Sequence, residues 1–413
     1  MTRLKTAAIL SVGDELVLGQ TVDTNSAWIS QQLAAVGVDV KAHATADDDR
    51  RLIAETMAFL CKRHDLLVVS GGLGPTDDDL TREALADLIG GELVRRDDLL
   101  ETLEEWFAGR KFPMKESNKR QAEVPVGAES VPNPVGTAPG LKAEHEGCRI
   151  VVTPGVPREM RRMVEDHVLP LAEGLGGGAV LKGRTLHTFG RGESDIAASL
   201  GALHERGRNP SVGTTVSDGI VSLRLNCRAT SAAEADRLLD EAEDACRAAV
   251  GPLLYGKDGQ SLQDVLHAML DGKTVSTVES CTGGLIAKML TDTPGSSAHV
   301  SYGWVTYANE AKEALGVEIG DGGAVCEDTV RQMAERGREK AGSTFCLATS
   351  GIAGPGGATA DKPVGHVWLA LATPDGTQAL QRTFPGDRAM VRDRTAKTAL
   401  QMLRLHLMGE RYE

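Results

Sequence analysis

The sequence predicts an α/β protein of three domains: a three-layer α/β/α domain, a small α+β domain and a final α/β domain, at residues 1–170, 178–259 and 260–413. Three observations support this prediction. The chain has 413 residues, more than one ordinary domain holds. Short apolar runs typical of buried strands alternate with helical patterns. Aromatic residues make up only 3% of the chain, so the cores must be aliphatic, which favours α/β layers.

In the first domain, residues 7–12, 66–70 and 150–153 are apolar runs that predict buried strands. Residues 25–36 have an amphipathic pattern that predicts a helix. Buried strands that alternate with helices indicate a mostly parallel sheet covered on both faces. The Gly-rich residues 173–178 break the pattern and predict a linker.

The second domain is expected to contain a strand, a helix, a β-hairpin and a long helix, at residues 184–189, 194–203, 211–216 with 220–229, and 232–250. It shows no evident reactive constellation. The third domain is expected to begin with a helix that Ser261 caps and that ends at Leu270. Further strands are expected at residues 274–278, 299–307, 346–349, 366–371 and 380–384, and further helices at 285–290, 327–340 and 388–407.

The formal net charge of −13 argues against a general affinity for nucleic acid or anionic membranes, but it leaves room for a local phosphate pocket. The seven cysteines are scattered and form no Cys-x-x-Cys pair, so neither a disulfide framework nor a zinc knuckle is expected. The first apolar run is too short for a signal peptide or a membrane span. These features favour a soluble cytoplasmic protein without a membrane partner.

The loop of residues 71–81 stands where a predicted strand meets a helix, and its glycines allow a ligand to approach the backbone closely. Its three adjacent carboxylates, residues 77–79, suit either a helix cap or a metal site. Residues 11–16 and 153–159 also join a strand end to glycine and acids, and such loops gather at the carboxyl edge of a parallel sheet. Carboxylates beside a phosphate-binding backbone fit Mg²⁺ and a phosphorylated substrate.

Ser280 follows an apolar strand and opens a helix, so its hydroxyl should lie on a sharp turn beside helical amides that can stabilise an oxyanion. The alternative is that Ser280 or Thr282 caps the helix. Cys281 is intrinsically the stronger nucleophile. However, no histidine lies near it in the sequence, and buried structural cysteines are common.

Tyr307 and Lys312 lie at a predicted strand-to-helix transition and could activate the serine. A Ser–Lys pair needs a lysine that desolvation or a cationic neighbour keeps neutral. The alternative is that Tyr307 packs and Lys312 is solvated. Residues 351–357 add a backbone-rich loop suited to a phosphate or an oxyanion. From the residues alone, the prediction is a hydrolase of a phosphorylated small molecule.

Six segments of the first domain resemble the CinA family of competence/damage-inducible proteins: residues 13–16, 19–20, 23–25, 71–81, 133–140 and 154–160. The resemblance implies a fold like that of the MoaB/MogA molybdopterin-binding proteins, and metal-dependent hydrolysis of ADP-ribose to AMP and ribose 5-phosphate. It implies a divalent cation such as Mg²⁺, and admits K⁺ as a second ion. The implied metal residues are Asp14, Asp78, Asp79 and Glu159, and the implied binding residues are Asn25, Gly71, Gly72, Gly74 and Thr76.

The third domain resembles the C-terminal domain of the same family, which also occurs alone as a nicotinamide-nucleotide amidase, at residues 279–284, 294–297, 307–312, 351–357, 362–365 and 384–388. The resemblance implies cofactor-free hydrolysis of nicotinamide mononucleotide to nicotinate mononucleotide and ammonia. It implies Ser280 as the nucleophile and Tyr307 and Lys312 as acid/base partners. The implied binding residues are Thr282, Gly283, Gly351, Ala353, Gly354, Gly356 and Arg388. The chain departs from the family pattern at Ala308, Cys326 and Ser350, none of which is a proposed catalytic group.

Two alternatives stay open. One is a molybdopterin-binding or nucleotidyl-transfer protein with an inactive C-terminal domain, and the other is an interaction protein in DNA uptake. The middle domain resembles a KH-like fold but lacks a Gly-x-x-Gly loop followed by basic residues, so direct nucleic-acid binding is not expected. The family resemblance implies a homodimer.

Overall fold

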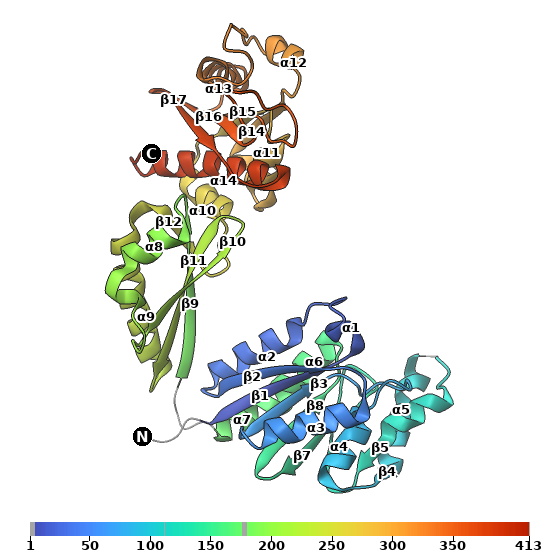
Figure 1. The fold of residues 1–413 in the computed structure, drawn as a ribbon. Helices are drawn as coiled ribbons and strands as arrows, with labels where there is room; N and C mark the ends of the chain where they lie inside the picture. The colour runs from blue at the N-terminus through green and yellow to red at the C-terminus, as the bar shows by residue number, and fades with distance from the viewer. Residues whose placement is uncertain (1–4, 111, 176–179, 413) are drawn as a thin grey trace. The chain divides into compact units, whose positions relative to one another are not determined.

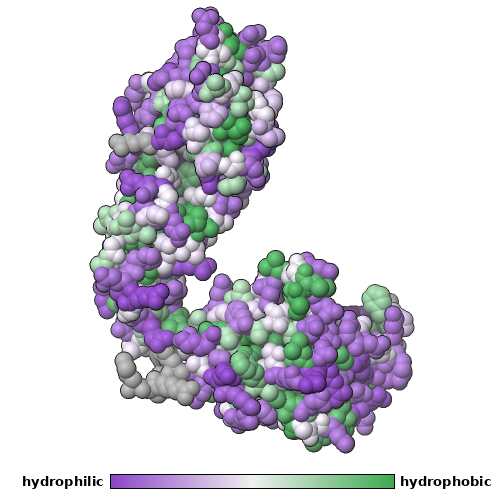
Figure 2. All heavy atoms as spheres, in the orientation of Figure 1, coloured by the Kyte–Doolittle hydropathy of each residue, from purple (hydrophilic) through white to green (hydrophobic). Residues whose placement is uncertain are grey.

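The computed structural model describes residues 5–110, 112–175 and 180–412. It contains two compact units: residues 1–182 with Cys227–Leu238, and Gly183–Asn226 with Leu239–Glu413. Figure 1 shows the elements of each unit, and Figure 2 shows that hydrophilic residues cover most of the visible surface. Within the described residues, no helix combines the length and the apolar character that crossing a membrane requires.

The first domain is a six-stranded sheet in the order β2-β1-β3-β8-β7-β6. Its strands are β1 (Thr6–Val12), β2 (Asp39–Ala46), β3 (Leu66–Ser70), β6 (Glu129–Val131), β7 (Gly140–His145) and β8 (Cys148–Thr153). The first four strands in the sheet order are parallel, and β7 and β6 add an antiparallel edge. The prediction of a mostly parallel sheet is confirmed, whereas the antiparallel edge was not predicted. A separate ribbon pairs β4 (Leu93–Arg95) with β5 (Glu123–Pro125).

Helices cover both faces of this sheet (Figure 1). The helical segments are α1 (Asp14–Val17), α2 (Thr24–Ala35), α3 (Arg50–Cys61), α4 (Thr81–Ile89), α5 (Asp97–Arg110), η1 (Glu116–Ala122), α6 (Pro157–Met163), η2 (Val164–Val168) and α7 (Leu169–Leu175). Side chains of β1 alternate between two cores, because successive residues of a strand point to opposite faces. Leu10 packs in the core that contains α3 and α4 residues, and Ile9 packs in the core that contains α2 and α6 residues.

The predicted linker at residues 173–178 is wrong in its first half. Glu173, Gly174 and Leu175 form the end of α7, and the buried Ala172 ties this helix to the core. Burial of that helix face outweighs the low helix propensity of Gly174. Residues 176–178 lie outside the described part of the chain.

The middle domain has a four-stranded sheet in the order β10-β11-β9-β12. Its elements are β9 (Val180–Phe189), α8 (Glu193–Leu200), η3 (Gly201–His204), β10 (Ser211–Ser217), β11 (Ile220–Ala229), α9 (Ala232–Val250), η4 (Gly251–Leu253) and β12 (Leu254–Lys257). The predicted strand, helix, hairpin and long helix are confirmed. The short strand β12 was not predicted.

The last domain has a five-stranded sheet in the order β14-β13-β15-β16-β17, with the first three strands parallel and the last two antiparallel. The strands are β13 (Val275–Glu279), β14 (Val300–Val305), β15 (Phe345–Gly351), β16 (His366–Thr373) and β17 (Gly376–Thr383). The helical segments are α10 (Leu262–Leu270), α11 (Leu285–Asp292), η5 (Ser296–Ala298), α12 (Asn309–Ala314), α13 (Glu327–Ala341) and α14 (Arg388–Leu407). The Ser261 side chain accepts from the amide of Asp264, which confirms it as the N-cap of α10.

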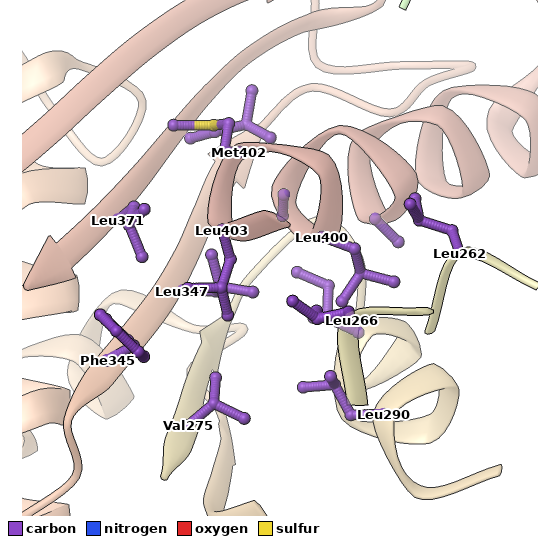
Figure 3. Packing of buried hydrophobic residues seen from close by; sticks show 14 of the residues in the cluster. Leu262, Leu266, Val275, Leu290, Phe345, Leu347, Leu371, Leu400, Met402 and Leu403 are labelled. Atoms are coloured by element: carbon purple, nitrogen blue, oxygen red, sulfur yellow. The ribbon is translucent and has the colours of Figure 1, made fainter. Parts of the chain in front are cut away.

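Two cores hold this last sheet. Figure 3 shows Leu400 and Leu403 of α14 packed with Leu266 of α10 and Leu347 of β15. On the other face, residues of α13 such as Met333 pack against the sheet. Full burial of an aliphatic side chain contributes roughly 1.5–3 kcal/mol. The ends of β13 and β15 are therefore held firmly where the Ser280 turn begins.

Candidate active sites

The turn that carries Ser280 connects β13 to α11. Gly283 and Gly284 have φ angles of 60° and 92°, which favour glycine, so the chain can reverse sharply after the serine. The amide of Ser280 donates to Thr349 O at 3.0 Å, which fixes the turn to the end of β15. Gly284 is the N-cap residue of α11, and no side chain caps this helix through that position. The helix-cap alternative for Ser280 and Thr282 is therefore wrong.

Glu279 is the last residue of β13, and its carboxylate reaches the first turn of α11. Its carboxylate accepts hydrogen bonds from the amides of Ile286 at 3.0 Å and Ala287 at 2.8 Å, and the side chain is fully buried. The expectation that amides of this helix serve an oxyanion is wrong for these two, because a carboxylate already takes them. Glu279 instead fixes the helix relative to the strand that presents Ser280.

Lys312 reaches Ser280 from α12. Its side chain is buried, with 1% of the residue exposed, and Nζ donates to Ser280 Oγ at 3.2 Å. Nζ also donates to the carbonyl oxygens of Thr306 at 2.9 Å and Tyr307 at 3.4 Å. Burial lowers the pKa of Lys312, while the charge of Glu310 acts in the opposite direction. The alternative of a solvated lysine is wrong, and the predicted Ser–Lys pair is present as a contact.

Tyr307 lies beside this pair with 56% of its surface exposed, so the alternative that it packs in the core is wrong. Arg388 Nη2 donates to Tyr307 Oη at 2.8 Å, and Arg388 Nη1 donates to Gly354 O at 2.7 Å. Arg388 therefore joins the phenol to the loop of residues 351–357. The three segments singled out in the third domain meet at one place.

Contacts with β15 and α14 hold Thr282, which follows Ser280 by two residues. Thr282 is buried, its Oγ1 lies 2.8 Å from Thr349 Oγ1, and its carbonyl accepts from Arg392 Nε at 3.2 Å and Nη2 at 2.7 Å. Burial raises the pKa of the Cys281 thiol to about 12. A buried, protonated thiol is a poor nucleophile. The geometry at this turn therefore favours Ser280 over Cys281 as the candidate nucleophile.

Of the other predicted binding residues, Gly283 lies near Arg392, because a Cβ there would stand 3.3 Å from Nη2. Gly351 ends β15, and Ala353 is buried in the adjoining core. Gly356 has open space around its Cα, so its backbone is accessible to a ligand.

A cavity of about 420 Å³ lies at the carboxyl ends of β1, β3 and β8 in the first domain. Among its lining residues are six predicted ones: Gly71, Gly72, Gly74, Asp78, Asp79 and Glu159. At Gly72, φ is 67°, and a Cβ would collide with the side chain of Thr81. Gly72 is thus required by the packing of the loop against Thr81, and the close approach of a ligand to this backbone stays a prediction.

The carboxylates of residues 77–79 have different surroundings. Asp79 accepts from the amides of Gly74 at 2.7 Å and Thr76 at 2.9 Å, and also from Thr76 Oγ1, so it fixes the loop. Asp78 is exposed and lines the cavity. Helix α4 has Leu80 at its N-cap and no side-chain cap, so the helix-cap alternative is wrong. The buried Arg82 stabilises the loop by donating to the carbonyls of residues 73 and 74 at 2.8 and 2.7 Å.

Asp14 is exposed and is not one of the residues that line the cavity, but it contacts Asp48, which does line it. Each accepts from the amide of the other, at 3.0 and 3.1 Å. Burial raises the pKa of Asp48, and the neighbouring charges of Asp14, Asp78 and Glu15 raise it further. The described residues contain no group of three or more His, Cys, Asp or Glu side chains placed to hold a metal ion by themselves.

Two predicted residues lie apart from this carboxylate cluster. Glu159 lines the cavity and accepts from Asn133 Nδ2 at 2.6 Å. Asn25 lines a neighbouring cavity of about 150 Å³ and donates to Ser70 Oγ at 3.2 Å and Gly155 O at 2.8 Å. Asn25 therefore connects the end of β3 to the residues that follow β8. Residues at these same two strand ends line the cavity of about 420 Å³.

Comparison with known proteins gives three family matches along the chain. Residues 8–174 match the probable molybdopterin binding domain, residues 183–256 the damage-inducible protein CinA KH domain, and residues 260–407 the CinA C-terminal domain. A putative competence-damage inducible protein of Symbiobacterium thermophilum is 42% identical, over 98% of this chain and 99% of its own length. The chain belongs to the CinA family.

A CinA-like protein of Geobacter sulfurreducens is 40% identical, over 97% of this chain and 99% of its own length. Among solved structures, CinA of Thermoplasma acidophilum is 33% identical over 41% of this chain and 98% of its own, with a TM-score of 0.38. The competence/damage inducible protein of Agrobacterium tumefaciens is 41% identical over 36% of this chain and 95% of its own, with a TM-score of 0.33. The predicted family and the three-domain fold class of this CinA protein are confirmed.

Three residues of this CinA chain carry contacts that the sequence analysis missed: Asp48, Glu279 and Arg392. Glu279 had a usable signal, since an acid at the end of a buried strand must find donors. Arg392 follows Arg388 by one helical turn, so both point to one side of α14. Asp48 had no such signal, because only the pairing of β2 with β1 brings it to Asp14.

Proposed function

We propose that the C-terminal domain hydrolyses the carboxamide of nicotinamide mononucleotide to nicotinate mononucleotide and ammonia. The observation that supports this most is the 3.2 Å contact between Lys312 Nζ and Ser280 Oγ in a buried environment. Three uncharged oxygens surround Nζ, those of Ser280, Thr306 and Tyr307. A lysine desolvated in this way loses its proton more readily and can act as a general base.

In the proposed reaction, neutral Lys312 accepts the Ser280 proton while Oγ bonds to the carboxamide carbon. The tetrahedral intermediate then expels ammonia and leaves an ester on Ser280. Lys312 returns its proton to the leaving nitrogen, directly or through Tyr307, and is neutral again. Water attacks this ester with the same lysine as base, so that the carboxylate leaves and the serine regains its proton. Arg388 is exposed beside the loop of residues 351–357, where it can bind the phosphate of the substrate.

The test is ammonia release from nicotinamide mononucleotide. The wild-type chain should release it, the Ser280→Ala variant should release none above background, and the Cys281→Ala variant should stay within about threefold of wild type. Release by Ser280→Ala at the wild-type rate would remove Ser280 as the nucleophile. Loss in Cys281→Ala alone would transfer that role to the thiol.

For the first domain, we propose metal-dependent hydrolysis of ADP-ribose to AMP and ribose 5-phosphate. The support is a cavity of about 420 Å³ that combines the backbone of the glycine loop with carboxylates such as Glu15, Asp48 and Asp78. The pKa of Asp48 is raised partly by its acidic neighbours, and a bound cation would relieve their repulsion.

The donors present fit Mg²⁺, which commonly uses one or two carboxylates and completes its coordination with substrate phosphates and water. Asp14, Asp78 and Glu159 are the proposed residues, while Asp79 holds the loop that approaches the phosphates. When bound, the ion would neutralise charge on the pyrophosphate. The residues themselves orient the substrate and fix the loop.

AMP formation from ADP-ribose in the presence of Mg²⁺ tests this second proposal. Asp78→Asn should lower the rate at least ~100-fold, because it removes a charge that faces the cavity. Asp77→Asn is the matched control: this side chain is fully solvent-exposed, and its contact with Arg120 is 3.6 Å long, so the rate should hardly change. Equal rates in both variants would exclude Asp78 as a metal residue, and no AMP from the wild type would favour the molybdopterin-binding alternative.

A further inference from the structure

The cavity of the first domain contains a polar side chain that its surroundings leave unsatisfied. Gln121 lines the cavity and is 1% exposed. Within the described part of the chain, its side-chain oxygen Oε1 is buried and has no hydrogen-bond partner. Buried polar groups are nearly always hydrogen-bonded, so an orphaned acceptor at a ligand cavity indicates a missing partner.

Gln121 is held in place by its neighbours in the chain. Arg120 Nη2 donates to Glu83 Oε1 at 2.8 Å and to Asp79 O at 3.4 Å, and Arg120 Nη1 donates to Thr76 O. On the other side, Ala122 is fully buried and its carbonyl accepts from the amide of Arg96 at 2.9 Å. These contacts fasten η1 to the loop of residues 71–81 before Gln121 and to Arg96 after it. The carboxamide therefore stays at the cavity wall.

The chemistry of the cavity defines what Gln121 can bind. Glu15, Asp48, Asp78 and Glu159 are acceptors suited to a cation, and the glycine loop offers backbone to phosphates. A carboxamide oxygen cannot pair with phosphate oxygens, which at neutral pH are chiefly acceptors. It can ligate a cation, but the charged carboxylates that line the same cavity attract a cation more strongly. An O–H or N–H donor on another part of the ligand is therefore the partner that best fits Oε1.

We propose that Gln121 accepts a hydrogen bond from a hydroxyl or amino group of a phosphorylated sugar or nucleotide, and so distinguishes such a ligand from bare phosphate or pyrophosphate. The inference rests on the proposed function in placing a phosphorylated ligand in this cavity, but it does not require that the ligand be cleaved. It assigns Gln121 to substrate recognition.

The test compares binding of three probes, AMP, ribose 5-phosphate and inorganic pyrophosphate, to the full chain with Mg²⁺ by calorimetric titration. The variant is Gln121→Met, which keeps the size of the side chain and removes the acceptor. It should bind AMP or ribose 5-phosphate about 10- to 100-fold more weakly than wild type and bind pyrophosphate equally well. Unchanged pyrophosphate binding also shows that the cavity is still folded. Ser117→Met, at an exposed position of the same segment, is the matched control and should bind all three probes as wild type does.

Loss with both sugar-containing probes would assign the donor to ribose, and loss with AMP alone would assign it to the base. Equal affinity of Gln121→Met and wild type for both would overturn the inference. So would an equal loss for all three probes, which would make Gln121 a support of the loop, or no binding of any probe by wild type. If the wild type binds AMP through Gln121 but never cleaves ADP-ribose, the inference stands and the proposed hydrolysis fails.

Discussion

The Ser280–Lys312 site is buried, whereas the cavity of the first domain is open and bordered by exposed charges. Ser280 and Lys312 are 8% and 1% exposed, while Asp14 and Asp78 lie at the surface. In the first case, the protein changes reactivity by removing water from a lysine. In the second, charges collect around a space that a cation and a phosphorylated ligand can fill. A substitution that changes the desolvation of Lys312 should therefore affect only the Ser280 site. A substitution that changes a charge at the cavity should affect only the first domain.

After Ser280→Ala, the largest expected effect of a single change comes from Lys312→Met. This variant keeps the length of the side chain and removes the proposed base, so kcat/KM for ammonia release should fall at least ~1000-fold. AMP formation by the first domain should not change. Lys288→Met is the control, because that lysine is largely exposed on α11 and should be replaceable without loss. If Lys312→Met retained most of the activity, Lys312 would not be the general base.

A smaller effect is expected from Glu279→Gln. The amide keeps one acceptor but turns the other into a donor that faces a backbone amide, so the first turn of α11 should shift relative to Ser280. We expect kcat for ammonia release to fall about 10-fold with little change in KM, because alignment of the serine is affected more than binding. Glu313→Gln, at an exposed position of α12, should leave both constants unchanged. A loss confined to KM would contradict a positioning role for Glu279.

The smallest effect concerns stability and pH. The unfolded chain keeps the Lys312 proton up to the ordinary pKa near 10.4, whereas the folded chain releases it at lower pH. The unfolded state therefore binds more protons between these two values, and wild-type stability should rise with pH in that window. The Lys312→Met variant lacks this pH-dependent contribution to the free energy of unfolding. Its melting temperature should therefore exceed that of wild type at neutral pH, and the difference should shrink as the pH approaches 10. A difference in melting temperature that is constant with pH would contradict burial of a titrating lysine.

Much of the fold could be predicted because its strongest elements have uninterrupted patterns. The fully buried strand β3, the hairpin strand β11 and the long helices α9 and α14 follow the predicted bounds. Strand β2 was missed because its residues are mostly half-exposed or exposed, so that it has no apolar run. Burial on both faces produces the clearest sequence signal, and edge strands lack it.

The same limit applies to the candidate sites. Ser280 and Lys312 were identified from their motifs, and the structure shows that the two side chains meet. The contacts of Asp48 and the place of Gln121 at the cavity were not predictable from spacing. Asp48 depends on the register of β2 against β1, and Gln121 on the attachment of η1 by Arg120. Sequence patterns show which residues can react, whereas tertiary packing decides which of them are desolvated or left without a partner.

The most direct test of the Ser–Lys proposal is the titration of the Lys312 amine in the full chain, followed by NMR of ¹³C- or ¹⁵N-labelled lysine side chains and assigned with the Lys312→Met variant. The account predicts that this lysine titrates clearly below the ordinary value near 10.4, because burial disfavours its charged form. A Lys312 amine that titrates at the ordinary lysine value near 10.4 would contradict the proposed activation of Ser280.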